Sequence, residues 1–136
     1  MTNPTQTRHL KFIAFNARGI LPQKYEFRRL LLKYKIDIAL LNETHLKPYN
    51  NFHIANYSVY RNDRTWADGG GTAIIIKKGI PHQQLHLPPL QTIEATGALI
   101  KIKHQELLIA AVYKQPDKPL PNQDPTELTN LSLINI

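Results

Sequence analysis

The strongest constraint on the fold lies in residues 10–41, where two short apolar runs flank an amphipathic segment. LKFIAF (10–15) and IDIALL (36–41) each predict a buried β-strand. In the segment between them, 24–35, apolar side chains recur at helical spacing. They are Phe27, Leu30, Leu31 and Tyr34. A strand, a helix and a strand in so short a stretch form a βαβ unit, in which the two strands are parallel.

Parallel strands end at the same edge of a sheet, so the residues that follow them should meet. Asn16 follows the first strand, and Glu43 follows the second within IALLNETHL (38–46). Taken singly, each would more often be a turn residue or a loop acid. Together they lie at the edge where open α/β sheets bind ligands. One carboxylate beside one amide suits a hard cation such as Mg²⁺, which takes oxygen ligands and keeps several waters.

Beyond this unit, the pattern predicts antiparallel strands. Residues 56–64 alternate like a half-exposed strand, and residues 72–78 form the next, with a turn at the glycines 69–71 between them. Residues 98–113 predict a hairpin that turns near His104 and Gln105. Its second limb is apolar almost throughout, so we expect it to be central in its sheet.

Two later segments predict a loop and a helix. Residues 79–90 carry Pro81, Pro88 and Pro89 and read as a loop. After a second proline-rich loop, Asp124 starts a helix, because a first-turn proline and an acid follow it at capping positions. The apolar end LSLINI has no partner after it. We therefore expect a disordered N-terminus (1–9) and one domain (10–136) truncated at its C-terminus.

Charge and cysteine content narrow the choice of partners and compartment. Lys and Arg number 17 against 10 Asp and Glu, and the net charge of +7 favours a polyanionic partner such as nucleic acid. There is no cysteine, which excludes disulfides and thiolate metal sites. The N-terminus does not have the pattern of a signal peptide, and no stretch is long enough to span a bilayer. We expect a nuclear or cytoplasmic protein with no membrane partner.

Three further groups of residues are candidates for function. Tyr113 ends an apolar strand and could donate a hydrogen bond to phosphate, although an aromatic at a strand end more often packs on the rim. Arg61 and Arg64 accompany several aromatic residues and could contact nucleic acid, although an exposed strand face is at least as probable. These aromatic residues are Tyr57, Tyr60 and Trp66. His82 and His86 have metal-pair spacing, but the prolines around them argue for a loop without a third ligand.

Taken in order, FNARGI, NETHL, YRNDR with GGGTAIII, and AAVYKQP resemble the endonuclease/exonuclease/phosphatase superfamily over residues 10–116. The resemblance is strongest to the endonuclease domain of non-LTR retrotransposons of the jockey kind. It implies a four-layered α/β sandwich of the DNase I type, present here in part. It also implies a phosphodiesterase that uses Mg²⁺, with Mn²⁺ as an alternative, and nicks DNA to prime a downstream reverse transcriptase domain.

The resemblance also assigns roles and shows what is missing. Glu43 corresponds to the metal-binding acid, Asn16 to the amide that organises metal and phosphate, and Tyr113 to the phosphate-contacting tyrosine. The family's Gly-Asp-x-Asn and Ser-Asp-His segments do not occur in this sequence. We therefore expect the chain alone to be catalytically incomplete. Two alternatives stay open: a non-catalytic remnant that binds nucleic acid or protein, and a phosphatase of the same superfamily.

Overall fold

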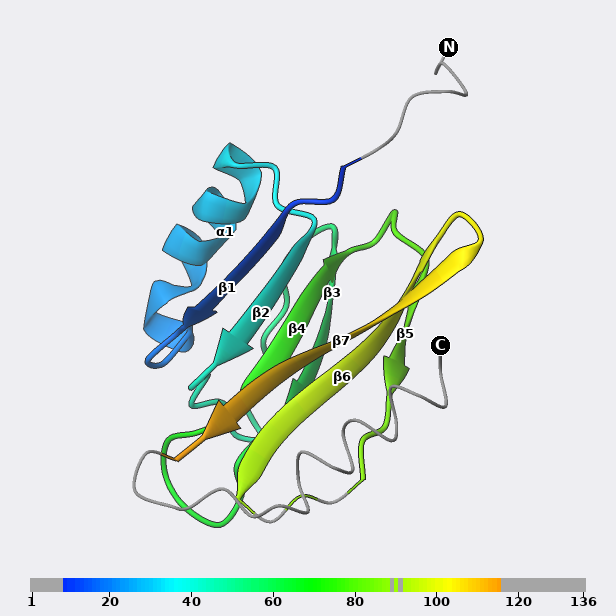
Figure 1. The fold of residues 1–136 in the computed structure, drawn as a ribbon. Coiled ribbons are helices and arrows are strands. Elements are labelled where there is room, and N and C mark those ends of the chain that lie inside the picture. Colours follow the sequence, from blue (N-terminus) through cyan, green and yellow to red (C-terminus); the bar gives the residue numbers. More distant parts are fainter. Residues whose placement is uncertain (1–8, 89, 91, 116–136) are drawn as a thin grey trace.

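The computed structural model describes residues 9–88, 90 and 92–115, which form two sheets and a flanking helix (Figure 1). The first sheet has the strand order β1-β2-β4-β3, and the second has the order β5-β6-β7. In chain order, the elements are β1 (Phe12–Asn16), the 3-10 helix η1 (Leu21–Gln23), α1 (Lys24–Lys33), β2 (Ile38–Asn42), β3 (Tyr57–Asn62), β4 (Thr72–Lys77), β5 (His82–Leu85), β6 (Ile93–Ile102) and β7 (Gln105–Lys114).

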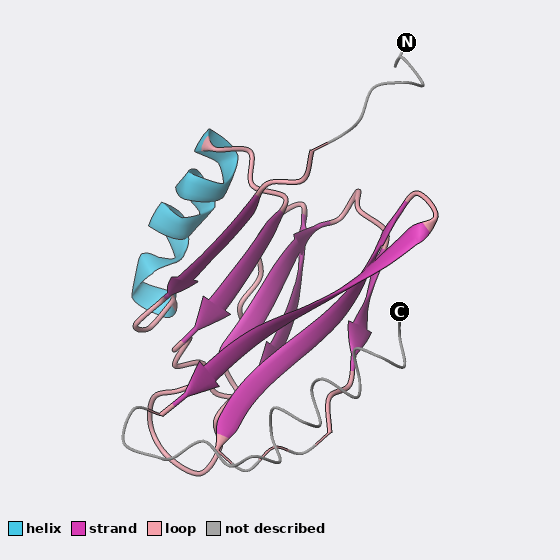
Figure 2. Ribbon diagram, in the orientation of Figure 1, coloured by secondary structure: helices cyan, strands magenta, loops and turns pink. Residues whose placement is uncertain are grey.

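The predicted βαβ unit and the mixed α+β class are both confirmed. β1 runs parallel to β2, with Phe12 opposite Ile38 and Asn16 opposite Asn42. Helix α1 lies on one face of the first sheet, and the second sheet crosses the other face (Figures 1 and 2). The described residues thus supply three layers of the predicted partial sandwich.

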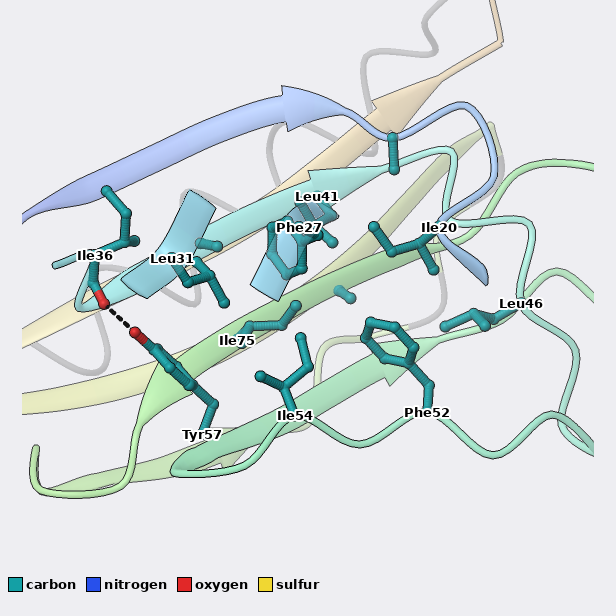
Figure 3. Close-up of a cluster of buried hydrophobic side chains, with 13 residues drawn as sticks. Ile20, Phe27, Leu31, Ile36, Leu41, Leu46, Phe52, Ile54, Tyr57 and Ile75 are labelled. Carbon is teal, nitrogen blue, oxygen red and sulfur yellow. Dashed lines mark hydrogen bonds between the residues drawn. The ribbon is translucent and has the colours of Figure 1, made fainter. Parts of the chain in front are cut away.

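The side chains of the central strands β2 and β4 point alternately to the two faces of the sheet, and this divides the core into two parts. Ala39 on β2 and Ile75 on β4 pack toward α1, in a cluster with Phe27 and Leu31 from the helix (Figure 3). This cluster also buries Tyr57, whose hydroxyl donates to the Ile36 carbonyl at 2.6 Å. Because side chains on a strand point alternately to opposite faces, the neighbouring positions of β2 and β4 face the second sheet.

The second part of the core fills the space between the two sheets. It is mainly isoleucine, a β-branched residue that packs well on a pleated surface. Its fully buried members come from three strands of both sheets and are Ile38, Ile74, Ile76, Ala98 and Ile100. This apolar interior fixes how the two sheets stack, and so it fixes which strand ends meet at the site.

Two details of the predicted βαβ unit are wrong. β1 is not a buried strand: among the strands that the structure describes, it is an edge of the first sheet, and Phe12 on it is 43% exposed. The helix is shorter than residues 24–35, because α1 ends at Lys33. Tyr34 therefore falls beyond the apolar stripe and is 54% exposed.

The second sheet also differs from its prediction. Residues 82–85 form the edge strand β5 within the segment predicted as a loop, directly after Pro81, a place where a sheet tolerates proline. The hairpin turns at the predicted place, but β6 begins at Ile93 rather than at residue 98. In the described part of the chain, β6 is the central strand and β7 is an edge, so the predicted central position of the second limb is wrong.

The remaining strand predictions are confirmed, as β3 and β4 lie within residues 56–64 and 72–78. Gly69, Gly70 and Gly71 all have positive φ, as the predicted turn requires. The predicted disorder at the N-terminus and the predicted helix after Asp124 lie outside the described residues. Within those residues, no helix has the length and apolar character needed to cross a membrane.

Candidate active site

Three loops meet at the carboxyl ends of β1 and β2. The loop after β1 bonds to the loop after β2, with Gly19 N 2.9 Å from the Glu43 carbonyl oxygen. On its other side, the loop after β2 bonds to the glycine turn before β4, with His45 N 2.8 Å from the Gly70 carbonyl oxygen. Glu43 is thus held between two neighbouring loops. Its φ of 53° is left-handed, a conformation that costs energy and persists only where the surroundings impose it.

The Glu43 side chain meets the two residues that the sequence places with it. The Tyr113 hydroxyl donates to Glu43 Oε1 at 2.8 Å, and the Asn16 side chain also hydrogen-bonds to the carboxylate. The Tyr113 bond is the main cause that lowers the pKa of Glu43 from its ordinary value of 4.5, although burial opposes the shift. Asn16, Glu43 and Tyr113 therefore form one cluster around a carboxylate that is ionised at neutral pH.

Tyr113 reaches this cluster from the second sheet. It stands opposite Glu94 in the β6–β7 register. Its pKa is raised above 10.0, first by the hydrogen bond to Glu43 and then by burial. At neutral pH it is therefore a neutral phenol that donates a proton in a hydrogen bond, and this contact links the two sheets at the site.

Sequence reasoning missed two basic neighbours of Glu43. Electrostatic interactions with His45 and Arg18 both favour the ionised form of Glu43 and add to the lowering of its pKa. Both side chains are exposed, and both residues have positive φ, at 58° and 47°. Arg18 N bonds to Asn16 Oδ1 at 3.0 Å, which turns the chain so that an exposed guanidinium stands near the carboxylate. The sequence FNARGI contained a sign of this position of Arg18. An asparagine side chain often bonds to the backbone two residues on, and such a turn brings that residue close to Asn16 and so to Glu43.

The two arginines predicted to contact DNA bond within the protein instead. Arg64 is 6% exposed, and its Nη2 lies 2.7 Å from Glu94 Oε2. Arg61 donates to the Lys47 and Asn50 carbonyls at 3.1 and 2.7 Å and pairs with Asp63 at 3.2 Å. These contacts favour the structural reading of both arginines.

A row of polar side chains crosses the ends of the first sheet and faces the second sheet. In register, the row is Asn16, Asn42, Thr72 and Asn62. Thr72 shares a hydrogen bond of 2.8 Å with Thr96, and Asn62 Nδ2 donates to the Ala95 carbonyl at 3.1 Å. This row forms a polar rim beside the isoleucine interior and joins the sheets next to Glu43. Sequence reasoning identified only its first member, although each member ends or begins a strand.

The histidine pair does not form a metal site. His82 Nδ1 lies 2.9 Å from the Tyr60 hydroxyl, and burial lowers the pKa of this histidine. In residues 9–88, 90 and 92–115, no group of three or more His, Cys, Asp or Glu residues could hold a metal. A zinc site of the usual three or four protein ligands does not fit these residues.

Comparison with known proteins decides which family this geometry belongs to. The sequence matches the Endonuclease/Exonuclease/phosphatase family over residues 13–131. The chain belongs to this family. It is 29% identical over 119 residues to the RNA-directed DNA polymerase from mobile element jockey of Drosophila funebris, a match that covers 85% of this chain and 12% of that protein.

A second relative of this endonuclease/exonuclease/phosphatase chain also comes from a mobile element. It is the probable RNA-directed DNA polymerase from transposon X-element of Drosophila melanogaster, 29% identical over 111 residues, or 79% of this chain. The match covers 12% of that relative as well. The chain thus spans a small part of the length of both relatives.

Solved structures agree on the fold. The endonuclease domain of TRAS1, a telomere-specific non-LTR retrotransposon, superposes with a TM-score of 0.64 at 18% identity, covering 88% of this chain and 52% of that one. Humanized D. rerio TDP2 superposes with a TM-score of 0.56 at 18% identity, covering 92% of this chain and 54% of that one. The predicted DNase I-like architecture is thereby confirmed.

Proteins of the endonuclease/exonuclease/phosphatase family typically depend on a divalent metal, and the donors at this site fit one. Mg²⁺ prefers oxygen ligands and is often bound by one or two carboxylates, with waters and substrate phosphates completing its shell. Glu43 is the carboxylate present at this site. At the same strand ends, the buried Asn42 Oδ1 has no hydrogen-bond partner among the described residues.

Proposed function

We propose that this chain provides part of the active site of a divalent-metal-dependent endonuclease that hydrolyses phosphodiester bonds in DNA. The observation that carries the proposal is the state of Glu43. Its carboxylate bonds to the neutral donors Tyr113 and Asn16 and forms no ion pair within the described residues, so its negative charge is available to a cation. The mobile-element relatives and the endonuclease fold of TRAS1 support a nuclease over a phosphatase.

Each residue of the cluster has a distinct proposed role. Glu43 would hold Mg²⁺, or Mn²⁺ in its place. When bound, the metal stabilises negative charge on the phosphate and on the leaving oxygen. Tyr113, neutral at the working pH, would turn its one hydroxyl proton from Glu43 to a phosphate oxygen when Glu43 binds the metal. Asn16 would orient the carboxylate, and the exposed Arg18 would attract the phosphate.

The proposed product has a place in retrotransposition. The two curated relatives are named as RNA-directed DNA polymerases, enzymes that need a primer. A nick that leaves a 3′ hydroxyl would provide that primer for a reverse transcriptase domain in the full-length protein. The net charge of +7 supports binding to DNA.

We further propose that the chain alone binds metal but cleaves DNA far more slowly than a complete domain. The sequence contains no Ser-Asp-His segment to supply the family's essential histidine. A positioned acid or base contributes roughly a hundredfold or more to such reactions, so its loss should remove measurable nicking.

Paramagnetic Mn²⁺ tests the metal site without requiring activity. Titrated into the ¹⁵N-labelled chain, it should broaden the amide signals of Gly19, Glu43 and Tyr113 first. Glu43→Gln removes the charged ligand and should abolish this selective broadening. Glu106→Gln removes the same charge from an exposed position on β7 and should leave it unchanged.

Two outcomes would contradict the proposal in different ways. Broadening that is unselective, or that persists in Glu43→Gln, would remove the metal role of Glu43 and favour a non-catalytic binding module. Nicking of supercoiled plasmid that requires Mg²⁺ and disappears in Glu43→Ala would show that the chain is catalytically complete. In that case only the proposed dependence on a missing histidine would be wrong.

A further inference from the structure

Trp66 is the one tryptophan of the chain, and it is exposed. It lies in the loop between β3 and β4, and 62% of its surface is open to solvent. An indole gains more from burial than most side chains do, and tryptophan is enriched at interfaces, where its ring is apolar and its N–H is polar. At protein interfaces, tryptophan is among the residues that most often carry the binding energy.

The indole stands on a rigid support. The Arg64 guanidinium carbon lies 4.6 Å from the centroid of the Trp66 ring. That guanidinium is fixed by Glu94, at 3.3 and 2.7 Å, and by the Asp68 carbonyl at 2.9 Å. Gly70 packs so closely against Arg64 that a Cβ there would collide with the guanidinium. Since the arginine cannot easily move, the indole that stacks on it is positioned before any ligand arrives.

Trp66 and the Arg64 guanidinium beneath it lie next to the Glu43 site. The loop that carries Trp66 ends in the glycine turn, whose Gly70 and Gly71 carbonyls accept bonds from His45 N and Thr44 N at 2.8 and 3.2 Å. These donors directly follow Glu43 in the chain. Trp66 also lines a cleft of about 490 Å³, together with polar side chains suited to hydrogen bonding. They include Asn62, Thr65, Gln84 and Thr96.

We propose that Trp66, stacked on Arg64, is a platform for a DNA base that lies beside the phosphate bound at Glu43. Every nucleobase has a π-face, and stacking on an aromatic residue is sequence-tolerant. The proposed role of Arg64 requires no contact with the phosphate, because three of its five N–H donors bond to Glu94 and to the Asp68 carbonyl. Its contribution is to hold the indole in place. The inference rests on the proposed function, which provides the phosphate.

Fluorescence tests the platform directly, because all tryptophan emission of the chain comes from Trp66. The ligands are a short fluorescein-labelled single strand, its duplex, an abasic strand of equal length, and inorganic polyphosphate. Binding is followed by fluorescein anisotropy, and stacking by quenching of the emission in parallel titrations with unlabelled DNA. We expect saturable quenching by the single strand, or by both DNA forms if paired bases also reach the indole. The abasic strand and polyphosphate should not quench.

Variants then measure the contribution to affinity. Trp66→Ala should weaken DNA binding roughly tenfold, and Trp66→Phe should restore most of the loss, because a phenyl ring also stacks. Tyr25→Ala is the matched control, since Tyr25 is 76% exposed on α1 and should have no effect. Circular dichroism shows whether each variant is folded, and the wild-type quenching needs no variant.

Binding without quenching, equal quenching by the abasic strand, or unchanged affinity in Trp66→Ala would each overturn the platform. In all three cases, Mn²⁺ broadening that depends on Glu43 would leave the proposed metal site standing. If no DNA binds at all, both the platform and the proposed DNA substrate are overturned. Failure of the metal response alone would remove the catalytic proposal and leave Trp66 as a DNA contact.

Discussion

Two carboxylates, Glu43 and Glu94, lie at the same end of the molecule and are satisfied in opposite ways. Glu94 accepts two bonds from the Arg64 guanidinium and a third from Gly71 N at 3.1 Å. Its charge is matched within the protein. Glu43 accepts bonds from the neutral Tyr113 and Asn16, and the basic residues near it, Arg18 and His45, are exposed.

The difference indicates that one carboxylate at this end of the molecule stabilises the fold, while the other is free to bind a ligand. A buried charge must be paired, because removing it from water is costly, and the buried Arg64 pairs with the partly buried Glu94 in that way. The same pairing leaves Glu94 little capacity for another cation. Glu43 is oriented by hydrogen bonds that keep its full negative charge, which is the condition a hard metal ion requires. The comparison therefore predicts large stability effects at the Glu94 pair and small ones around Glu43.

The largest expected effect comes from removing the buried arginine. Arg64→Ala leaves the Glu94 carboxylate without its cation and should lower the free energy of unfolding by about 3 kcal/mol. Arg18→Ala removes an exposed guanidinium near Glu43 and should change it by less than about 0.5 kcal/mol. Urea denaturation followed by circular dichroism measures both. Equal losses of unfolding free energy in the two variants would contradict the distinction between the paired carboxylate Glu94 and the carboxylate Glu43, which is available to a cation.

Replacing the carboxylates themselves should give a smaller contrast. Glu94→Gln keeps the shape of the side chain but weakens charged hydrogen bonds to Arg64, and should cost about 2 kcal/mol. Glu43→Gln still offers an oxygen to Tyr113, so its cost should stay within about 0.5 kcal/mol. The same denaturation experiment applies. A larger loss at Glu43 would mean that this carboxylate is mainly a structural residue.

Much of this edge could be predicted from the sequence, because it depends on local patterns. The strand-helix-strand segment required parallel strands, and parallel strands required Asn16 and Glu43 to end at one edge. The strand end made Tyr113 a candidate, but only the family resemblance favoured a role at the site over packing on the rim. Its apolar strand showed no sign of which sheet it would join or where that sheet would cross.

The charge pairing could not be predicted, since it depends on contacts between distant segments. Glu94 is 30 residues from Arg64, and no periodic pattern connects them. Arg61 and Arg64 were candidates for DNA contacts because they lie near aromatic residues in the sequence. That pattern does not distinguish an arginine that binds a phosphate from one that pairs with a carboxylate of the protein. The edge position of β1 was missed for a related reason, as an apolar run does not show whether both faces are covered.

The smallest expected effect concerns pH. The pKa of folded Glu43 lies below 4.5, mainly because of the Tyr113 hydroxyl, so the ionised form is favoured in the folded state. Glu43 therefore contributes stability that is fully present above about pH 4.5, its unfolded pKa, and is lost as pH falls through the folded pKa. Tyr113→Phe removes the main cause and should move the Glu43 pKa upward. Titration of the Glu43 side-chain carboxyl carbon by NMR measures the shift.

Tyr25→Phe removes an exposed hydroxyl on α1 and should leave the Glu43 titration unchanged. The same NMR series in Arg18→Ala should raise the pKa less than Tyr113→Phe does, because the Arg18 charge is the weakest of the contributing causes. A larger shift from the arginine would mean that charge, rather than the neutral phenol, keeps Glu43 ionised. Glu43 would then resemble Glu94 more closely than the geometry indicates.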